Sequence, residues 1–293
     1  IILATLGVMI TTAITGGIIF LVTRYFFGSI TLTLYESLLL AAVISSTDSA
    51  SVFSILRSKG LRLKENLRPM LEFESGSNDP MAYMLTVVLI QLIQSSGMGA
   101  SQIAFSFVIQ FVVGAAAGYL LGKLAIWALR RGAFPSEQSQ TIFIFSVVIL
   151  SYALPTALGG NGYLSAYLCG IWMGNTKLPQ KRYLVHFFDV VTDVAQVLIF
   201  FLLGLLVTPV ELPSVLLPAL SVMAFLTLVG RPLVAALLLL PFRPSLGQVG
   251  VVSWAGLRGV ASIVFAIMAV LGGVEMKYDL FNLVFCIVLL SIS

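Results

Sequence analysis

Residues 38–56 read LLLAAVISSTDSASVFSIL, an apolar run whose centre holds five consecutive polar residues. A helix needs about 20 mostly apolar residues to cross the hydrocarbon core of a membrane, and the wider segment 34–56 provides them. Polar residues such as Ser46 and Asp48 are tolerated at that depth where the backbone unwinds beside a cavity inside the protein. The stretch therefore predicts a membrane helix that is broken near its midpoint.

A second interruption of the same kind lies far along the chain. Residues 256–259 read GLRG and interrupt the apolar segment 246–271. Glycine lowers the cost of leaving helical geometry, and the arginine between the two glycines needs a polar environment. We therefore expect a second broken helix here.

The composition places the whole chain in a membrane. Of the 293 residues, 59% are hydrophobic and 10% are charged, whereas a soluble domain carries about 25% charged residues. Repeated apolar runs predict an all-α polytopic membrane protein with ten transmembrane helices. The expected helices are 1–22, 34–56, 69–94, 102–129, 139–157, 162–175, 184–207, 214–240, 246–271 and 279–293.

Basic residues set the predicted orientation, because loops on the cytoplasmic side of a membrane are enriched in Lys and Arg. Placing the loop after the second helix in the cytoplasm leaves Arg24 and Lys277 on the other side. The basic residues then at cytoplasmic ends are Arg57, Lys59, Arg62, Lys64, Arg68, Lys123, Arg130, Arg131, Lys177, Lys181, Arg182 and Arg243. The net charge of +4 is thus distributed by membrane side, and it does not favour binding to nucleic acid.

Five charged side chains fall at membrane depth, where each costs at least about 2.5 kcal/mol to insert. They are Asp48, Glu74, Asp79, Arg231 and Arg258. If the last three helices repeat the first three in inverted orientation, the two broken helices cross near the midplane of the membrane. Asp48 on one and Arg258 on the other would then balance the partial charges of the exposed helix ends.

The third helix carries the group of residues most suited to bind an ion. Ser75 and Asp79 are four residues apart, so a hydroxyl and a carboxylate share one face, next to Asn78. In a partly dehydrated pocket, a proton and a cation compete for one carboxylate, and this competition suffices for exchange. Pro80 frees a backbone carbonyl one turn earlier, and Thr47 could add a further oxygen. We expect Glu74 to form a structural ion pair with Arg231.

These motifs together resemble those of the monovalent cation:proton antiporter family, which includes the sodium/proton exchangers. The resemblance rests on Thr47-Asp48, Glu74-Ser75-Gly76-Ser77-Asn78-Asp79, Arg231-Pro232 and Gly256-Leu257-Arg258-Gly259, in the family's order and spacing. Ser58-Lys59-Gly60-Leu61-Arg62 and Leu71-Glu72-Phe73-Glu74 look most like the bacterial potassium/proton branch. Gly76-Ser77 departs from the family, in which two apolar residues are common at this place.

The resemblance implies roles for the residues of the site. Asp79 would carry the cation and the proton, with Asn78 beside it and oxygens from Thr47 and Ser75, while Asp48 would lie at the crossing. A K⁺ or Na⁺ ion would bind at Asp79, Ser75 and Thr47. The Asn-Asp pair implies electroneutral one-for-one exchange, with no cofactor and no enzymatic activity.

The resemblance also implies an organisation for the chain. Residues 1–293 would form one transmembrane domain, with core helices in 1–94 and 214–293 and intervening helices in 102–207. The chain would lack the first three family helices, and the full-length protein would be a homodimer in the bacterial inner membrane.

Two other classes of protein remain open. An ion channel also uses acidic residues in its pore, but it would pass a current. An intramembrane aspartyl protease would use Asp48 and Asp79 as its catalytic pair, which leaves Asn78 and Arg231 unexplained. The choice between K⁺ and Na⁺ is open as well.

Overall fold

The computed structural model describes residues 2–25, 32–58, 60, 63, 67–94, 99–132, 134, 136–178, 181–274, 276 and 279–292. Within these ranges every regular element is a helix, which confirms the predicted all-α class. Lys59, Arg62, Lys64 and Lys277 of the predicted orientation, and Leu61 of the family motif, lie outside the described residues.

The chain divides into two compact units. Unit 1 comprises Ile1–Met98 and Leu206–Ser293, and unit 2 comprises Gly99–Leu205. In unit 1 the helices are α1 (Leu6–Tyr25), α2 (Leu34–Val43), α3 (Ser49–Ser58), α4 (Leu67–Gln94), α9 (Leu212–Phe225), η1 (Leu226–Gly230), α10 (Arg231–Leu239), η2 (Leu240–Phe242), α11 (Leu246–Trp254), α12 (Val260–Leu271) and α13 (Leu280–Ile292). In unit 2 they are α5 (Ala100–Arg130), α6 (Glu137–Ala157), α7 (Gly162–Gly174) and α8 (Lys181–Leu206).

Five of the described helices are long and apolar enough to cross a membrane. They are Leu6–Tyr25, Ser101–Arg130, Glu137–Ala157, Lys181–Leu206 and the composite run Leu212–Phe242. The predicted first helix, 1–22, is shifted: residues 2–5 form a turn and α1 continues to Tyr25. Those first residues are as apolar as the helix itself, so hydropathy could not mark its start.

The predicted break in segment 34–56 separates α2 from α3. A capping box starts α2: the Thr33 hydroxyl accepts from the Glu36 N–H, and the Glu36 carboxylate accepts from the Thr33 N–H. The helix ends at Val43, and residues 44–48 form an unwound link. The Asp48 side chain then starts α3 by accepting from the Ser51 N–H at 3.2 Å.

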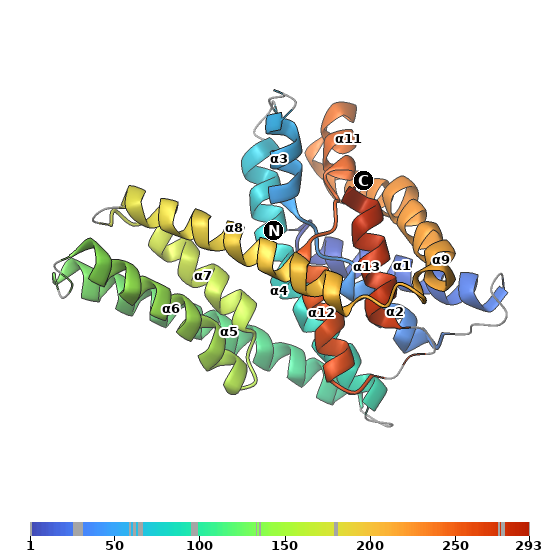
Figure 1. The fold of residues 1–293 in the computed structure, drawn as a ribbon, viewed down its shortest axis with the longest axis horizontal. Coiled ribbons are helices and arrows are strands. Elements are labelled where there is room, and N and C mark those ends of the chain that lie inside the picture. Colours follow the sequence, from blue (N-terminus) through green and yellow to red (C-terminus); the bar gives the residue numbers. More distant parts are fainter. Residues whose placement is uncertain are drawn as a thin grey trace. The chain divides into compact units, whose positions relative to one another are not determined.

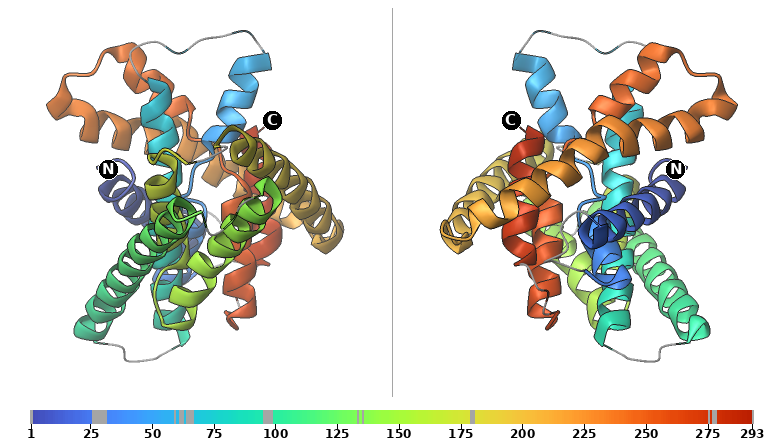
Figure 2. Two further views of the ribbon diagram at one scale, coloured as in Figure 1. Left: turned by 90° about the vertical axis from the view of Figure 1, so that its left-hand side faces the viewer. Right: turned by 90° about the vertical axis from the view of Figure 1, so that its right-hand side faces the viewer.

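The predicted break in segment 246–271 separates α11 from α12, with residues 255–259 as the link. The two links cross inside unit 1 (Figures 1 and 2), where the Asp48 N–H donates to the Leu257 carbonyl at 2.8 Å. A Cβ atom on Gly259 would lie 2.6 Å from the Cβ of Asp48, so the crossing requires glycine at this position.

α9 and α10 form one helical run that contains a π-helical turn, η1, directly before Arg231. Pro213 lies in the first turn of α9, where its missing N–H costs no helical hydrogen bond. A π-turn accommodates more residues than an α-turn, is rare, and is frequent at functional sites.

In unit 2, α5 and α7 pack closely and run parallel (Figure 1). Gly114, Gly118 and Gly122 of α5 face Asn161, Ser165 and Cys169 respectively, which lie at the start of α7 and along it at the same four-residue spacing. A Cβ on Gly114 would lie 2.6 Å from the Asn161 carbonyl oxygen. The glycines therefore allow the two backbones to approach, as small residues do between membrane helices.

Candidate functional site

The half-buried carboxylate of Asp79 faces the link between α2 and α3. The Ser46 hydroxyl, at the middle of that link, donates a hydrogen bond to Asp79 Oδ1. Ser46 itself is almost fully buried. Hydrogen bonds to a charged group are stronger than neutral ones, so this contact favours the ionised carboxylate.

Asn78 joins the same helix, α4, to Thr47 of the link. Its amide Nδ2 donates to the Thr47 hydroxyl, while its Oδ1 is buried and has no hydrogen-bond partner among the residues that the structure describes. A buried carbonyl oxygen without a donor is destabilising, but it is a suitable ligand for a hard cation. Asn78 is 1% exposed, so its amide group is buried in this conformation.

Ser75 fixes α4 to the start of α3. Its hydroxyl donates to the Thr47 carbonyl at 2.7 Å and accepts from the Ser49 N–H at 3.1 Å. Ser75 and Asp79 lie one turn apart on α4, yet they contact different residues of the link. Three oxygen-bearing side chains within about one turn of α4 therefore hold the unwound segment in place.

Charged side chains lie at the ends of the broken helices, with signs that complement the helix dipoles. Arg258 is buried and donates from Nη1 to the carbonyls of Ser45 and Ser46, at 2.8 and 3.1 Å, just after α2 ends. Asp48 accepts from the first turn of α3 and lies against Gly259, the residue that caps the start of α12. The cation thus sits at a negative helix end and the anion at positive ones.

Arg231 lies beside this crossing and forms a buried ion pair with Glu74. The two residues are 6% and 3% exposed. Arg231 Nε also donates to the carbonyl of Val252, in the last turn of α11, at 3.4 Å. A Cβ on Gly256 would lie 3.0 Å from the Arg231 side chain, so the arginine occupies the space next to the second link. Loss of one partner of such a pair typically costs about 3–5 kcal/mol.

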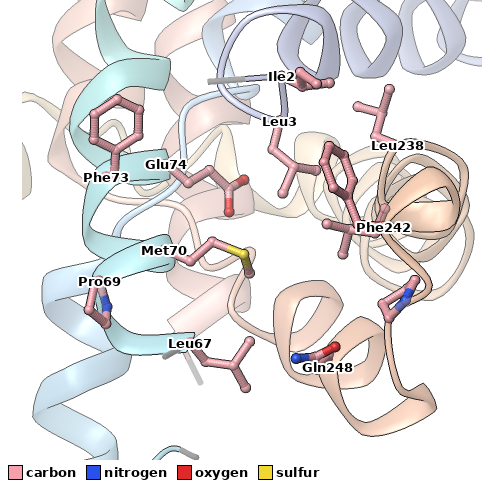
Figure 3. Close-up of a pocket in the computed structure, with 12 residues that line it drawn as sticks. Ile2, Leu3, Leu67, Pro69, Met70, Phe73, Glu74, Leu238, Phe242 and Gln248 are labelled. Atoms are coloured by element: carbon pink, nitrogen blue, oxygen red, sulfur yellow. The ribbon is translucent and has the colours of Figure 1, made fainter. Parts of the chain in front are cut away.

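An apolar cavity of about 660 Å³ ends at the Glu74 carboxylate. Figure 3 shows this carboxylate pointing into the cavity between Met70, Leu3 and Leu238. Among the described residues that line the cavity, Glu74 alone belongs to the predicted site. The cavity therefore approaches the ion pair rather than the Asp79 carboxylate.

The structure brings most of the predicted site residues into one place in unit 1. Thr47 is hydrogen-bonded to Asn78 and to Ser75. The Asp48 N–H is hydrogen-bonded to the carbonyl of Leu257, in the unwound segment that also carries Arg258. Sequence reasoning missed Ser46, the residue that contacts Asp79. Its only signal was its position within the polar stretch 45–49, because an unwound segment has no periodicity that assigns each side chain a direction.

Comparison with known proteins places the chain in a family. The sequence profile described as "Sodium/hydrogen exchanger, transmembrane" matches residues 1–293. The chain is 38% identical over 296 residues to the K(+)/H(+) antiporter NhaP of Alkalimonas amylolytica, and 39% identical over 294 residues to the K(+)/H(+) antiporter NhaP2 of Shewanella oneidensis. Each alignment covers 99% of this chain and 49% of the relative, so the chain spans about half the length of these relatives.

The fold has a counterpart among solved structures. The sodium proton antiporter MjNhaP1 from Methanocaldococcus jannaschii superimposes with a TM-score of 0.81 at 22% sequence identity. The match covers 99% of this chain and 74% of that protein, which confirms the antiporter fold that the family resemblance implies. With its apolar helices, the chain is part of a multi-pass membrane protein. It belongs to the transmembrane sodium/hydrogen exchanger family.

Proposed function

We propose that this chain is the ion-translocating part of a secondary transporter that exchanges a monovalent cation for a proton at Asp79. The observation that carries the proposal is the contact between Asp79 and Ser46, because it places a carboxylate against the unwound link of a broken helix. Transporters bind their coupling ions at such links, where backbone oxygens become available.

The same carboxylate would bind the proton and the cation in turn. When the cation binds, Asp79 would contribute a carboxylate oxygen, and Ser75, Thr47 and the unpartnered Oδ1 of Asn78 would offer further oxygens. When the cation leaves, the dehydrated carboxylate would take a proton. A single titrating group gives the carrier the same net charge in both states, which supports electroneutral one-for-one exchange.

The remaining charged residues would support the site without moving ions. Glu74 and Arg231 neutralise each other, and Asp48 and Arg258 lie at helix ends of opposite sign. Fixed pairs of this kind keep the crossing electrically balanced, so that the charge that changes during the cycle is that of Asp79.

Potassium is the favoured cation because the relatives that align over 99% of the chain are named K(+)/H(+) antiporters.

We further propose that unit 1, with core helices in 1–94 and 214–293, moves as a body relative to the helices in 102–207. The complete protein would be a homodimer in the bacterial inner membrane. An ion channel and an aspartyl protease are the rival functions: a channel would pass a current, and a protease would leave Asn78 and Arg231 unexplained.

The test uses the complete protein in liposomes that contain a pH-sensitive dye. Pulses of potassium, sodium or lithium chloride should drive proton efflux in the wild type, and the preferred cation should give the largest response. In Asp79→Asn the efflux should fall to that of protein-free vesicles, because the amide can hold neither the proton nor the cation charge. Glu137→Gln, which removes an exposed carboxylate in the first turn of α6 in unit 2, should leave exchange unchanged.

A voltage clamp with potassium and valinomycin separates the carrier from its rivals. Exchange that is insensitive to the clamp supports the electroneutral cycle. A cation current in place of exchange would establish a channel, and full exchange in Asp79→Asn would move the site elsewhere.

A further inference from the structure

A basic cavity lies in unit 2, where α5 and α7 end together. The parallel packing of these helices brings the C-terminal turns of both to the same end of the unit. There a cavity of about 720 Å³ is lined by Lys123, Arg130, Arg131, Trp127 and Trp172, among others. None of the described residues that line it is acidic, so its positive charge is uncompensated.

Aromatic rings hold two of the cations in place. The Lys123 ammonium lies 4.5 Å from the centre of the Tyr119 ring, and the Arg131 guanidinium lies 4.3 Å from that of Trp127. Tyr119 in turn packs edge-on against Trp172 of α7, at 5.3 Å between ring centres. Cation–π contacts orient a charged group while its outer N–H groups stay free to bind an anion.

The rest of the cavity suits hydrocarbon. Leu120 and Leu124 follow the same side of α5 towards the centre of the membrane span, and they are 57% and 59% exposed. Lys123 and Arg131 are eight residues apart, about 12 Å along the helix. Tryptophan and basic residues are typical of the level of the lipid headgroups at the ends of membrane helices.

We propose that this cavity binds a phospholipid with an anionic headgroup. The headgroup phosphate would lie beside Arg130 and Arg131 and within the electrostatic field of Lys123, and an acyl chain would cover Leu124 and Leu120. Charge complementarity selects this occupant, since a zwitterionic lipid would leave the three cations partly unneutralised. Basic cavities between membrane helices bind anionic headgroups by the same physics.

The test measures binding directly and does not depend on ion exchange, so its result is independent of the function proposed for Asp79. The complete protein, purified in detergent, is titrated with phosphatidylglycerol while bound lipids are counted by native mass spectrometry. Each basic residue contributes about 1 kcal/mol, so its loss should weaken binding about fivefold. The double variant Lys123→Gln/Arg131→Gln should therefore bind about 25-fold more weakly.

Two control variants and two control ligands decide the outcome. Arg24→Gln removes a cation that also packs on a ring, that of Phe20 in unit 1, and should bind like the wild type. Lys123→Arg keeps the charge and should retain binding, which separates loss of the site from loss of folding. Equal binding in the double variant, equal weakening in Arg24→Gln, tight binding of phosphatidylcholine, or displacement by inorganic phosphate alone at the same concentration would each overturn the proposal.

Discussion

At the scale of single residues, Ser46 is the contact that ties the carboxylate of Asp79 to the unwound link. It lies next to Thr47, which the family motif marks, but it contacts Asp79, the proposed ion-binding residue, directly. Because Ser46 also offers its backbone carbonyl to Arg258, it connects Asp79 to the charge that caps the end of α2. Removal of the Ser46 hydroxyl should therefore alter proton binding at Asp79 without displacing α2.

We expect Ser46→Ala to move the pH profile of exchange rather than to abolish it. Without the hydroxyl donor the ionised carboxylate is less stable, so protons compete with the cation up to a higher pH. A lost hydrogen bond to a charged group, about 1.5 kcal/mol, corresponds to a shift of about one pH unit. The measurement is exchange rate against pH in liposomes.

Ser214→Ala is the matched control, because that exposed hydroxyl donates to the carbonyl of Glu211, outside the crossing. Its profile should coincide with that of the wild type. A Ser46→Ala profile that also coincides would mean that the hydroxyl has no part in the binding of protons.

At the scale of helices, the crossing of the two broken helices depends on the absence of a side chain at Gly259. In Gly259→Ala the new methyl group would meet the side chain of Asp48, and overpacking of this kind costs about 1–3 kcal/mol. We expect a lower melting temperature of the protein in detergent, together with slower exchange.

Gly250→Ala tests the same substitution in α11, where a new Cβ would meet no atom within 4 Å. Alanine is the better helix former by about 1 kcal/mol, so this variant should be as stable as the wild type or slightly more stable. Equal melting temperatures for the two variants would show that the crossing can widen at no cost.

The breaks in these helices were predictable, because a polar interruption inside an apolar run is a local property of the sequence. The predicted interruptions, 45–49 and 256–259, overlap the observed links 44–48 and 255–259. The contacts across the crossing were less predictable. Arg231 reaches the last turn of α11 as well as Glu74, and this second contact depends on tertiary packing that no spacing encodes.

At the scale of the molecule, Asn282 secures the segment through which the chain returns from unit 2 to unit 1. Its Oδ1 accepts from the Thr208 N–H at 3.2 Å, and its amide donates to Glu211 at 3.0 Å and Asp279 at 2.7 Å. The side chain is fully buried at the start of α13. One amide therefore joins the return segment, α9 and α13.

Asn282→Ala should lower the stability of the protein by about 1–3 kcal/mol, because it removes three hydrogen bonds made by a fully buried side chain, two of them to carboxylates. Thermal melting of the complete protein in detergent measures the loss. Asn175→Ala removes an exposed amide that bonds to the last turns of α7, and it should change stability by less than about 0.5 kcal/mol. Similar losses in both variants would contradict a special role for Asn282.

The π-turn before Arg231 makes the number of residues in this run as important as their identity. Each residue added to an α-helix rotates the remainder of the helix by about 100°, and a π-turn absorbs one surplus residue. The turn at Leu226–Gly230 thus sets the direction from which Arg231 meets Glu74. The ion pair therefore depends on two properties of the sequence: the identity of the two charged residues, and the number of residues that precede Arg231 in this helical run. An insertion or a deletion in the run would change that number and redirect Arg231 even if both charged residues were kept.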